Sequence, residues 1–129
     1  MAQIKTFTIA LENRPGAVAE IAKILGNAKV NILALLGSAQ GIAGTVQLIA
    51  ENSRRAKKAL AGAGLTYAES TAEEYELPNK PGALAECLAK LAAKGINLNS
   101  IYATAPKGGK TAVVVYSAEA APTEAAATA

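Results

Sequence analysis

The sequence predicts an α+β protein made of two βαββαβ units, each an antiparallel sheet with its helices on one face. The first observation is an internal repeat, because residues 11–20 recur 66 residues later as residues 77–86 with seven of the ten positions identical. The second is the hydrophobic pattern, in which strand-like alternation and helical spacing follow each other in the same order in both halves. A repeat at a fixed period predicts two copies of one structural unit.

The repeat divides the 129 residues into a first unit, residues 1–71, and a second unit, residues 72–129. We expect its register to hold without a gap from the pair Leu11/Leu77 to the pair Glu51/Ser117. The copy then fails in an Ala-rich tail from about residue 118, which we expect to be frayed or a short helix. The second unit should therefore lack its last strand. An open strand edge needs a cover, and a partner chain, the first unit or the tail could supply it.

In the first unit, residues 4–11 alternate between apolar and polar side chains and predict a half-buried strand. Pro15 then starts a helix, because a proline in the first turn costs no hydrogen bond. We expect strands at residues 4–11, 30–37, 45–50 and 66–70, and a turn at residues 38–43. The first helix should run from Pro15 to about residue 28, with its inner face formed by Val18, Ile21, Ala22 and Leu25. The second helix should be capped by Asn52 or Ser53, with its inner face formed by Ala56, Leu60 and Ala63.

The second unit repeats this order. We expect strands at residues 73–77, 96–103 and 111–116, a turn at residues 106–109, and a helix that buries Leu84, Cys87, Leu88 and Leu91. Cys87 is interpreted as a small core residue rather than a reactive thiol. Right-handed crossovers give such a ferredoxin-like unit the strand order 4-1-3-2.

Composition excludes several classes of function. There is no histidine and no aspartate, so His/Cys zinc sites and histidine-based catalytic triads are absent. We expect no enzyme, no catalytic residue, no metal and no cofactor. A net charge of +3 without a continuous basic stripe, and Phe7 as the one aromatic residue on the first strand, argue against nucleic-acid binding. One cysteine and no long apolar run predict a cytoplasmic protein outside the membrane.

The best-kept part of the repeat is a loop and helix start, which points to a site present twice. Asn13-Arg14-Pro15-Gly16 recurs as Asn79-Lys80-Pro81-Gly82. A helix start with a glycine suits a carboxylate, and an asparagine side chain can both donate and accept hydrogen bonds. A second asparagine recurs as Asn31 and Asn97, which suggests a pocket for a free amino acid. The loop asparagines could instead simply satisfy backbone groups in a tight turn.

On these motifs each half resembles an ACT domain, a small regulatory module that binds amino acids. The resemblance covers residues 4–71 and 72–117. It implies a ligand between two modules packed side by side, held by the loop of one module and the strand asparagine of its neighbour. The leucines at positions 11 and 77, where serine-sensing members have a histidine, argue against serine. The ligand-binding residues so implied are Asn13, Arg14, Pro15, Gly16, Ala17, Asn31, Ile32, Asn79, Lys80, Pro81, Gly82, Ala83, Asn97 and Leu98.

The sequence thus predicts a non-catalytic sensor that binds a free amino acid between ACT units and is a homodimer. Allosteric regulation follows if a regulated protein partner distinguishes the ligand-bound state. The alternative is a non-catalytic oligomerisation or protein-interaction module with no ligand.

Overall fold

The computed structural model describes residues 2–105 and 107–119. The predicted tail, beyond its first two residues, lies outside the described residues. No helix in the described part is long and apolar enough to cross a membrane. In chain order the elements are β1 (Ala2–Glu12), α1 (Ala17–Asn27), β2 (Ile32–Gln40), β3 (Ala43–Ala50), α2 (Ser53–Gly62), β4 (Tyr67–Pro78), α3 (Ala83–Ala93), β5 (Asn97–Thr104) and β6 (Thr111–Glu119). The predicted α+β class is confirmed.

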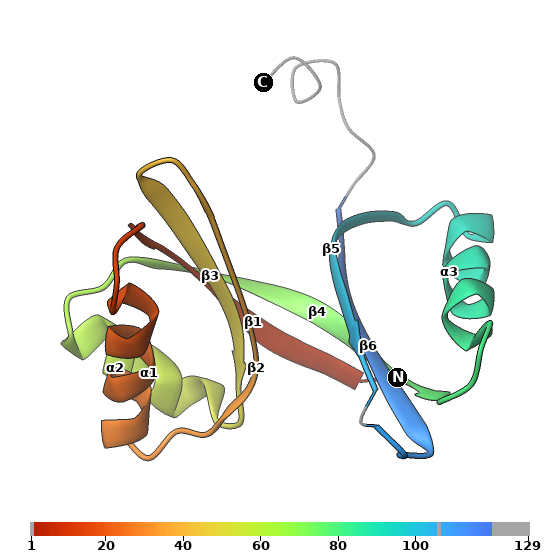
Figure 1. Ribbon diagram of the computed structural model, residues 1–129, viewed down its shortest axis with the longest axis horizontal. Helices are drawn as coiled ribbons and strands as arrows, with labels where there is room; N and C mark the ends of the chain where they lie inside the picture. Colours follow the sequence, from red (N-terminus) through yellow and green to blue (C-terminus); the bar gives the residue numbers. More distant parts are fainter. Residues whose placement is uncertain (1, 106, 120–129) are drawn as a thin grey trace. The chain divides into compact units, whose positions relative to one another are not determined.

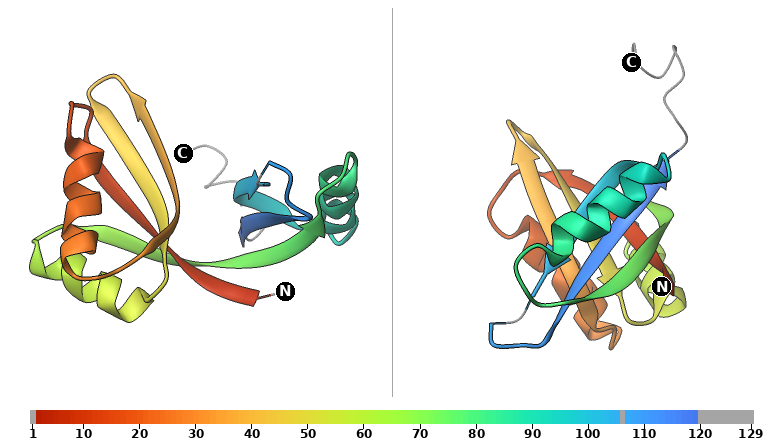
Figure 2. Two further views of the ribbon diagram at one scale, coloured as in Figure 1. Left: turned by 60° about the horizontal axis from the view of Figure 1, so that its bottom comes forward. Right: turned by 90° about the vertical axis from the view of Figure 1, so that its right-hand side faces the viewer.

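The chain forms two compact units. The N-terminal unit is Lys5–Thr71, and the C-terminal unit joins the first four residues to the segment from Ala72 onward. The N-terminal unit has the strand order β2-β3-β1-β4, as the sequence predicted. Its helices α1 and α2 both cover one face of this sheet (Figure 1; Figure 2).

Strand β4 corrects the predicted strands at residues 66–70 and 73–77, because one unbroken strand, Tyr67–Pro78, replaces them. No glycine, proline or asparagine lies between the two predicted segments to turn the chain. Ser70 and Thr71 instead have an extended backbone, and their side chains contact β1. The Ser70 and Thr6 hydroxyl oxygens are 2.7 Å apart, and Lys5 Nζ donates to Thr71 Oγ1. The predicted boundary between residues 71 and 72 falls inside this strand and stays a prediction.

The start of β1 covers the open strand edge of the C-terminal unit. The strand order there is β1-β4-β6-β5, and the first four residues belong to this unit. Gln3 Nε2 donates to Glu73 Oε1 on β4 at 3.4 Å. In the described residues the unit has no last strand of its own, so residues from the beginning of the chain stand in for it.

The ungapped register between the repeats is wrong beyond the second strand. Glu12 pairs with Ala43 and Pro78 with Thr111, so the offset between the units is 66 residues at the first strand and 68 at the third. The second hairpin is therefore two residues longer than the first. Glu51 corresponds to Glu119, not to Ser117.

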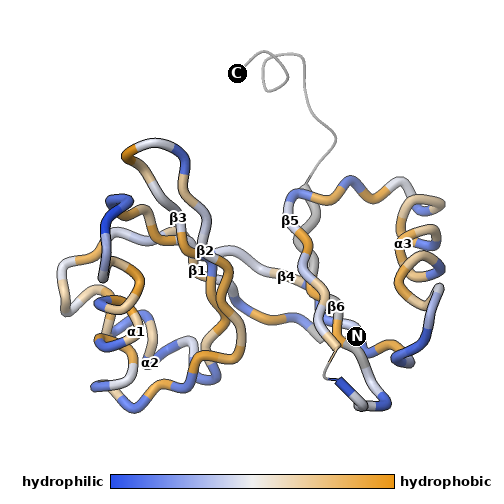
Figure 3. Tube along the Cα trace, viewed as in Figure 1, coloured by the Kyte–Doolittle hydropathy of each residue, from blue (hydrophilic) through white to orange (hydrophobic). Residues whose placement is uncertain are grey.

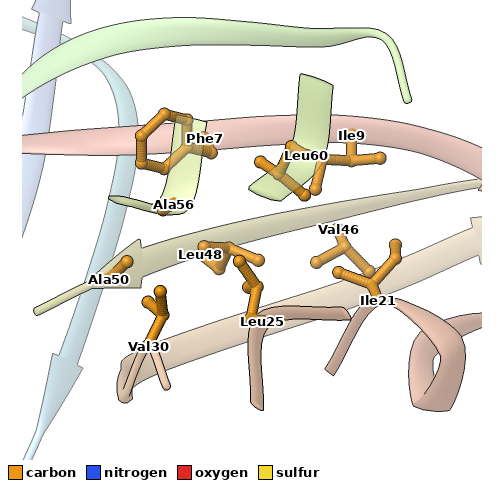
Figure 4. Packing of buried hydrophobic residues seen from close by; sticks show 10 residues of the cluster. All are labelled: Phe7, Ile9, Ile21, Leu25, Val30, Val46, Leu48, Ala50, Ala56 and Leu60. Atoms are coloured by element: carbon orange, nitrogen blue, oxygen red, sulfur yellow. The ribbon is translucent and has the colours of Figure 1, made fainter. Parts of the chain in front are cut away.

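The main core lies in the N-terminal unit, between its sheet and its helices. Figure 4 shows Ala56 beside Phe7 and Leu60 beside Ile9, so α2 covers β1. Hydrophobic and hydrophilic colours alternate along both helices in Figure 3, as expected for helices buried on one face. The cluster consists of Phe7, Ile9, Ile21, Leu25, Val30, Val46, Leu48, Ala50, Ala56 and Leu60.

The predicted inner faces of the helices need a correction. Ala17 and Ala83 are buried, whereas Val18 and Leu84 are 37% and 39% exposed. The buried positions recur every four residues, as Ala17, Ile21 and Leu25 in α1 and as Ala83 and Leu91 in α3, so the buried stripe passes through the alanine and leaves the next residue at its edge. Ala22 and Ala63 are also exposed, and Cys87 is half-buried because no second helix covers α3 in the described part of its unit.

Candidate functional site

Each repeated loop turns sharply into its helix through a left-handed glycine. Gly16 has φ 85° and Gly82 has φ 88°, and both occupy the N-cap position. Side chains other than glycine rarely adopt this conformation, which explains why the repeat keeps both glycines. Neither helix start has a side-chain cap, whereas the Asn52 side chain accepts from Arg55 N–H at the start of α2. The Ala17 N–H donates to the Arg14 carbonyl oxygen at 3.3 Å and the Ala83 N–H to that of Lys80 at 3.2 Å, so the next N–H groups and the positive end of the helix dipole are what each helix start offers to a ligand.

The loop asparagines fasten each loop to the tip of a hairpin. The Asn13 backbone N–H donates to the carbonyl oxygen of Ile42 at 3.0 Å, and its Nδ2 donates to that of Gly41 at 2.7 Å. Asn79 repeats the arrangement with Lys110 at 2.9 Å and Gly109 at 2.8 Å. Both asparagines therefore satisfy backbone carbonyl groups, as the alternative interpretation of the sequence expected. These hydrogen bonds place each loop against the neighbouring hairpin.

A small cleft lies between each loop, the helix that follows it and the neighbouring hairpin. The cleft of the N-terminal unit has about 250 Å³ and that of the C-terminal unit about 200 Å³. The loop and helix start contribute equivalent residues to both: Asn13, Arg14, Ala17 and Val18 in the first, and Asn79, Lys80, Ala83 and Leu84 in the second. The other predicted loop residues, Pro15, Gly16, Pro81 and Gly82, line neither cleft.

The hairpin wall of each cleft was missed by the sequence analysis. Strand β2 contributes Gly37, Ser38 and Ala39, and strand β5 contributes the equivalent Ala103 and Thr104, followed by Ala105. Two signals were available in the repeat: an alanine stands at both positions 39 and 105, and a hydroxyl residue at both 38 and 104. Both hydroxyls offer a hydrogen-bond donor and acceptor, and the first cleft has a further hydroxyl from Thr45 of β3.

Arg14 is held in place by two carboxylates. Its Nη2 lies 2.8 Å from Glu20 Oε2, and its Nε lies 3.4 Å from Glu12 Oε2. The hydrogen bond and charge of Glu20 raise the pKa of Arg14, and the same contact lowers the pKa of the Glu20 carboxyl. In the C-terminal unit Pro78 replaces Glu12, so the two clefts differ in charge at the loop.

The strand asparagines lie away from the clefts of their own units. The Asn31 carbonyl oxygen accepts from Glu51 N–H at 2.9 Å, just before β2 begins, whereas the cleft is lined by residues toward the end of that strand. Asn97 pairs with Glu119 in the equivalent place. Ile32 packs against the main core and Leu98 is half-buried. Within one unit the predicted site residues therefore form two separate groups, one at each end of the strand.

Both the sequence and the fold are similar to those of known proteins. A family model described as an ACT domain pair matches residues 2–126. The chain belongs to this family. ACT domains are regulatory domains that bind amino acids, so the predicted resemblance, tandem organisation and regulatory class are confirmed. No curated protein matches the chain.

Solved structures of similar fold include protein BT0572 from Bacteroides thetaiotaomicron, with 28% identity and a TM-score of 0.84 over 92% of this chain and 81% of that one. The ligand-free regulatory subunit of aspartate kinase from Thermus thermophilus is 13% identical, with a TM-score of 0.68 over 90% and 83%. The regulatory subunit of aspartate kinase from Thermus flavus is 14% identical, with a TM-score of 0.64 over 88% and 82%. At these identities the two kinase subunits show the fold alone.

Proposed function

We propose that this ACT domain pair is a non-catalytic sensor that binds a free amino acid in the loop clefts. The main observation in support of this proposal is that both units form a cleft from equivalent residues, at a helix start that has no side-chain cap. The ligand carboxylate would accept from N–H groups in the first turn of α1 or α3. The ligand ammonium would donate to hydroxyl or carbonyl oxygens of the hairpin wall.

Cleft size supports a small ligand. Sites for drug-sized molecules have about 300–1,000 Å³, whereas these clefts have about 250 and 200 Å³. The apolar wall residues favour an amino acid with a small or aliphatic side chain. The site would be completed by a neighbouring module that brings its Asn31 or Asn97, since neither asparagine reaches the cleft of its own unit.

A homodimer formed through edge strands would supply that neighbouring module. Strand β2 ends the sheet of the N-terminal unit, and its Leu33, Leu35 and Leu36 are 59%, 42% and 48% exposed. Exposed apolar side chains on an edge strand favour pairing with another strand. We propose that β2 pairs with a second copy, and Leu35→Glu should then convert a dimer into a monomer in light scattering. The same exposed edge also favours the alternative function, an interaction module without a ligand.

The test is a calorimetric titration with each of the twenty free amino acids. Ala39→Leu fills the first cleft, and Ala105→Leu, at the equivalent position, fills the second. Ala61→Leu, on the exposed side of α2, is the matched control because it lines neither cleft. We expect each cleft variant to remove one class of sites and the control to leave binding unchanged. Binding of no amino acid to the original chain would reject the sensor and leave the interaction module.

A further inference from the structure

A larger cleft of the C-terminal unit lies between α3 and β4, on the helix-covered side of the sheet. It has about 380 Å³ and is formed by Tyr75 and Leu77 of β4 with Ala83, Cys87 and Leu91 of α3. This α3–β4 groove adjoins the loop cleft of the same unit and shares Leu77, Pro78, Lys80 and Ala83 with it, but it extends along α3 to Cys87, Lys90 and Lys94, whereas the loop cleft extends to β5 and β6. Its floor is apolar and open.

The N-terminal unit shows what occupies this side of the sheet. Ile9 and Leu11 stand at the positions of Tyr75 and Leu77, and the remaining cavity there has about 250 Å³ and includes Leu65, which follows α2. Figure 4 shows that Leu60 of α2 lies on Ile9. The described part of the C-terminal unit has α3 and no second helix (Figure 1). The groove therefore lies where α2 lies in the N-terminal unit, and the described part of the C-terminal unit has no helix at this position.

The rim of the groove is mainly basic. Lys80, Lys90 and Lys94 line it together with one acid, Glu86, whose Oε1 lies 4.0 Å from Lys90 Nζ. At the positions of Lys90 and Lys94 the N-terminal unit has Ile24 and Ala28. Glu73, also on β4, stands at the position of the buried Phe7, and its Oε1 accepts from Gln3. Among the lining residues three lysines stand against one acid, so the rim favours an occupant with negative charge.

We propose that the α3–β4 groove is a docking site for an amphipathic helix of a partner protein. That helix would carry a narrow apolar face of small residues and leucine, as α2 does with Ala56 and Leu60, and acidic residues along its edges. The apolar face would cover Tyr75 and Leu77, and the acids would meet the lysines. Cys87, Lys90 and Lys94 line the groove and not the loop cleft, so tests on these residues separate this proposal from amino-acid binding in the loop clefts.

Cys87 provides the measurement, because it is the single cysteine of the chain and lines the groove. The probes are two synthetic helical peptides with the apolar face of α2, one with glutamates and one with lysines along its edges. The rate of a thiol reagent with Cys87 should fall about tenfold when the acidic peptide is present at ten times its dissociation constant. The basic peptide should give little protection.

Charge reversal tests the role of the rim. Lys90→Glu with Lys94→Glu should weaken the acidic peptide by roughly two- to fivefold per charge and should improve binding of the basic peptide. The matched control is Cys87→Ala with Ala61→Cys, which moves the thiol to the exposed side of α2, where neither peptide should protect it. Circular dichroism spectra of the variants should match that of the original chain.

Four results would overturn the proposal. Neither peptide protects Cys87, or both protect it equally. Removal of residues 120–129 raises the labelling rate tenfold without any peptide, which would assign the groove to the chain's own end. Protection of Cys87 rises with protein concentration in the absence of any peptide, which would assign the groove to a second copy of the chain.

Discussion

The Asn13 side chain donates from Nδ2 to the carbonyl oxygen of Gly41 at 2.7 Å, and this contact joins the loop before α1 to the tip of the β2–β3 hairpin. The C-terminal unit keeps the contact between Asn79 and Gly109 although its hairpin is two residues longer. The loop and the hairpin are the two walls of the cleft. The asparagine therefore holds one wall of the cleft against the hairpin that forms the other.

Replacement of Asn13 by alanine should lower the free energy of unfolding by about 0.5–1.5 kcal/mol, the usual net worth of one hydrogen bond. Urea denaturation measures the change. Asn13→Asp is the informative companion, because it keeps the shape but places a carboxylate oxygen where the donor was. It should destabilise at least as much as alanine, and a neutral effect would show that the donated hydrogen bond contributes little.

Gly16→Ala should destabilise the protein by about 1–2 kcal/mol, because the residue has φ +85° and a side chain there is strained. The matched control is Gly26→Ala, inside α1, which should stabilise by up to about 1 kcal/mol. A Cβ at either position meets no atom within 4 Å, so sterics with neighbours do not decide the sign. Thermal unfolding of both variants gives the comparison. Stabilisation by Gly16→Ala would contradict the left-handed conformation.

The ion pair between Arg14 and Glu20 should give a pH dependence. The hydrogen bond and charge of Arg14 lower the pKa of the Glu20 carboxyl in the folded protein, so the pair stabilises the fold above the ordinary carboxyl pKa. That contribution is lost as the pH falls through the lowered pKa. Arg14→Met should raise the Glu20 pKa toward its ordinary value, which an NMR titration of the side-chain carboxyl carbons detects. An unchanged pKa would mean that the pair does not persist in solution.

The two units should differ in local stability. Helix α1 contributes Ile21 and Leu25 to the main core, whereas in α3 the buried residues are Ala83 and Leu91. Less apolar burial makes local opening easier. We expect backbone amides of α3 to exchange with solvent faster than those of α1 in hydrogen–deuterium exchange. Equal protection of both helices in the absence of partners would show that something covers α3 in the free protein.

The fold class, element order and N-terminal strand order could be predicted because the local signals agree. Alternation gives the strands and Asn52 caps α2 as expected, but α1 begins at Ala17 after the N-cap Gly16, so the predicted helix start at Pro15 is two residues early. The merging of two strands into β4 was missed, because Ser70 and Thr71 read as a short link when only a few residues are considered. The shift of register was missed for a different reason: hairpin length is set by turn geometry, which leaves no trace in the hydrophobic period. The identical pairs Val46/Val114 and Glu51/Glu119 were the available signal.

The loop half of the candidate site could be predicted, because a left-handed glycine and a clamping asparagine constrain sequence strongly. The hairpin wall could not, since small residues such as Ala39 and Ser38 have no distinctive pattern until the loop is seen against them. The position of Asn31 at the far end of β2 follows from strand length alone. Which module it faces is a property of association between modules, and sequence patterns within one unit do not encode it.

Strands β1 and β4 each contribute residues to both compact units, so neither unit corresponds to one uninterrupted stretch of the chain. A fragment that begins at residue 72 would expose the backbone donors and acceptors of β4 and would tend to aggregate. A fragment that ends before residue 67 would lose the strand that borders β1. The sequence repeat is therefore a poor guide to where the protein can be cut. An independently folding C-terminal module would need residues 2–4 grafted back beside β4 through a new hairpin.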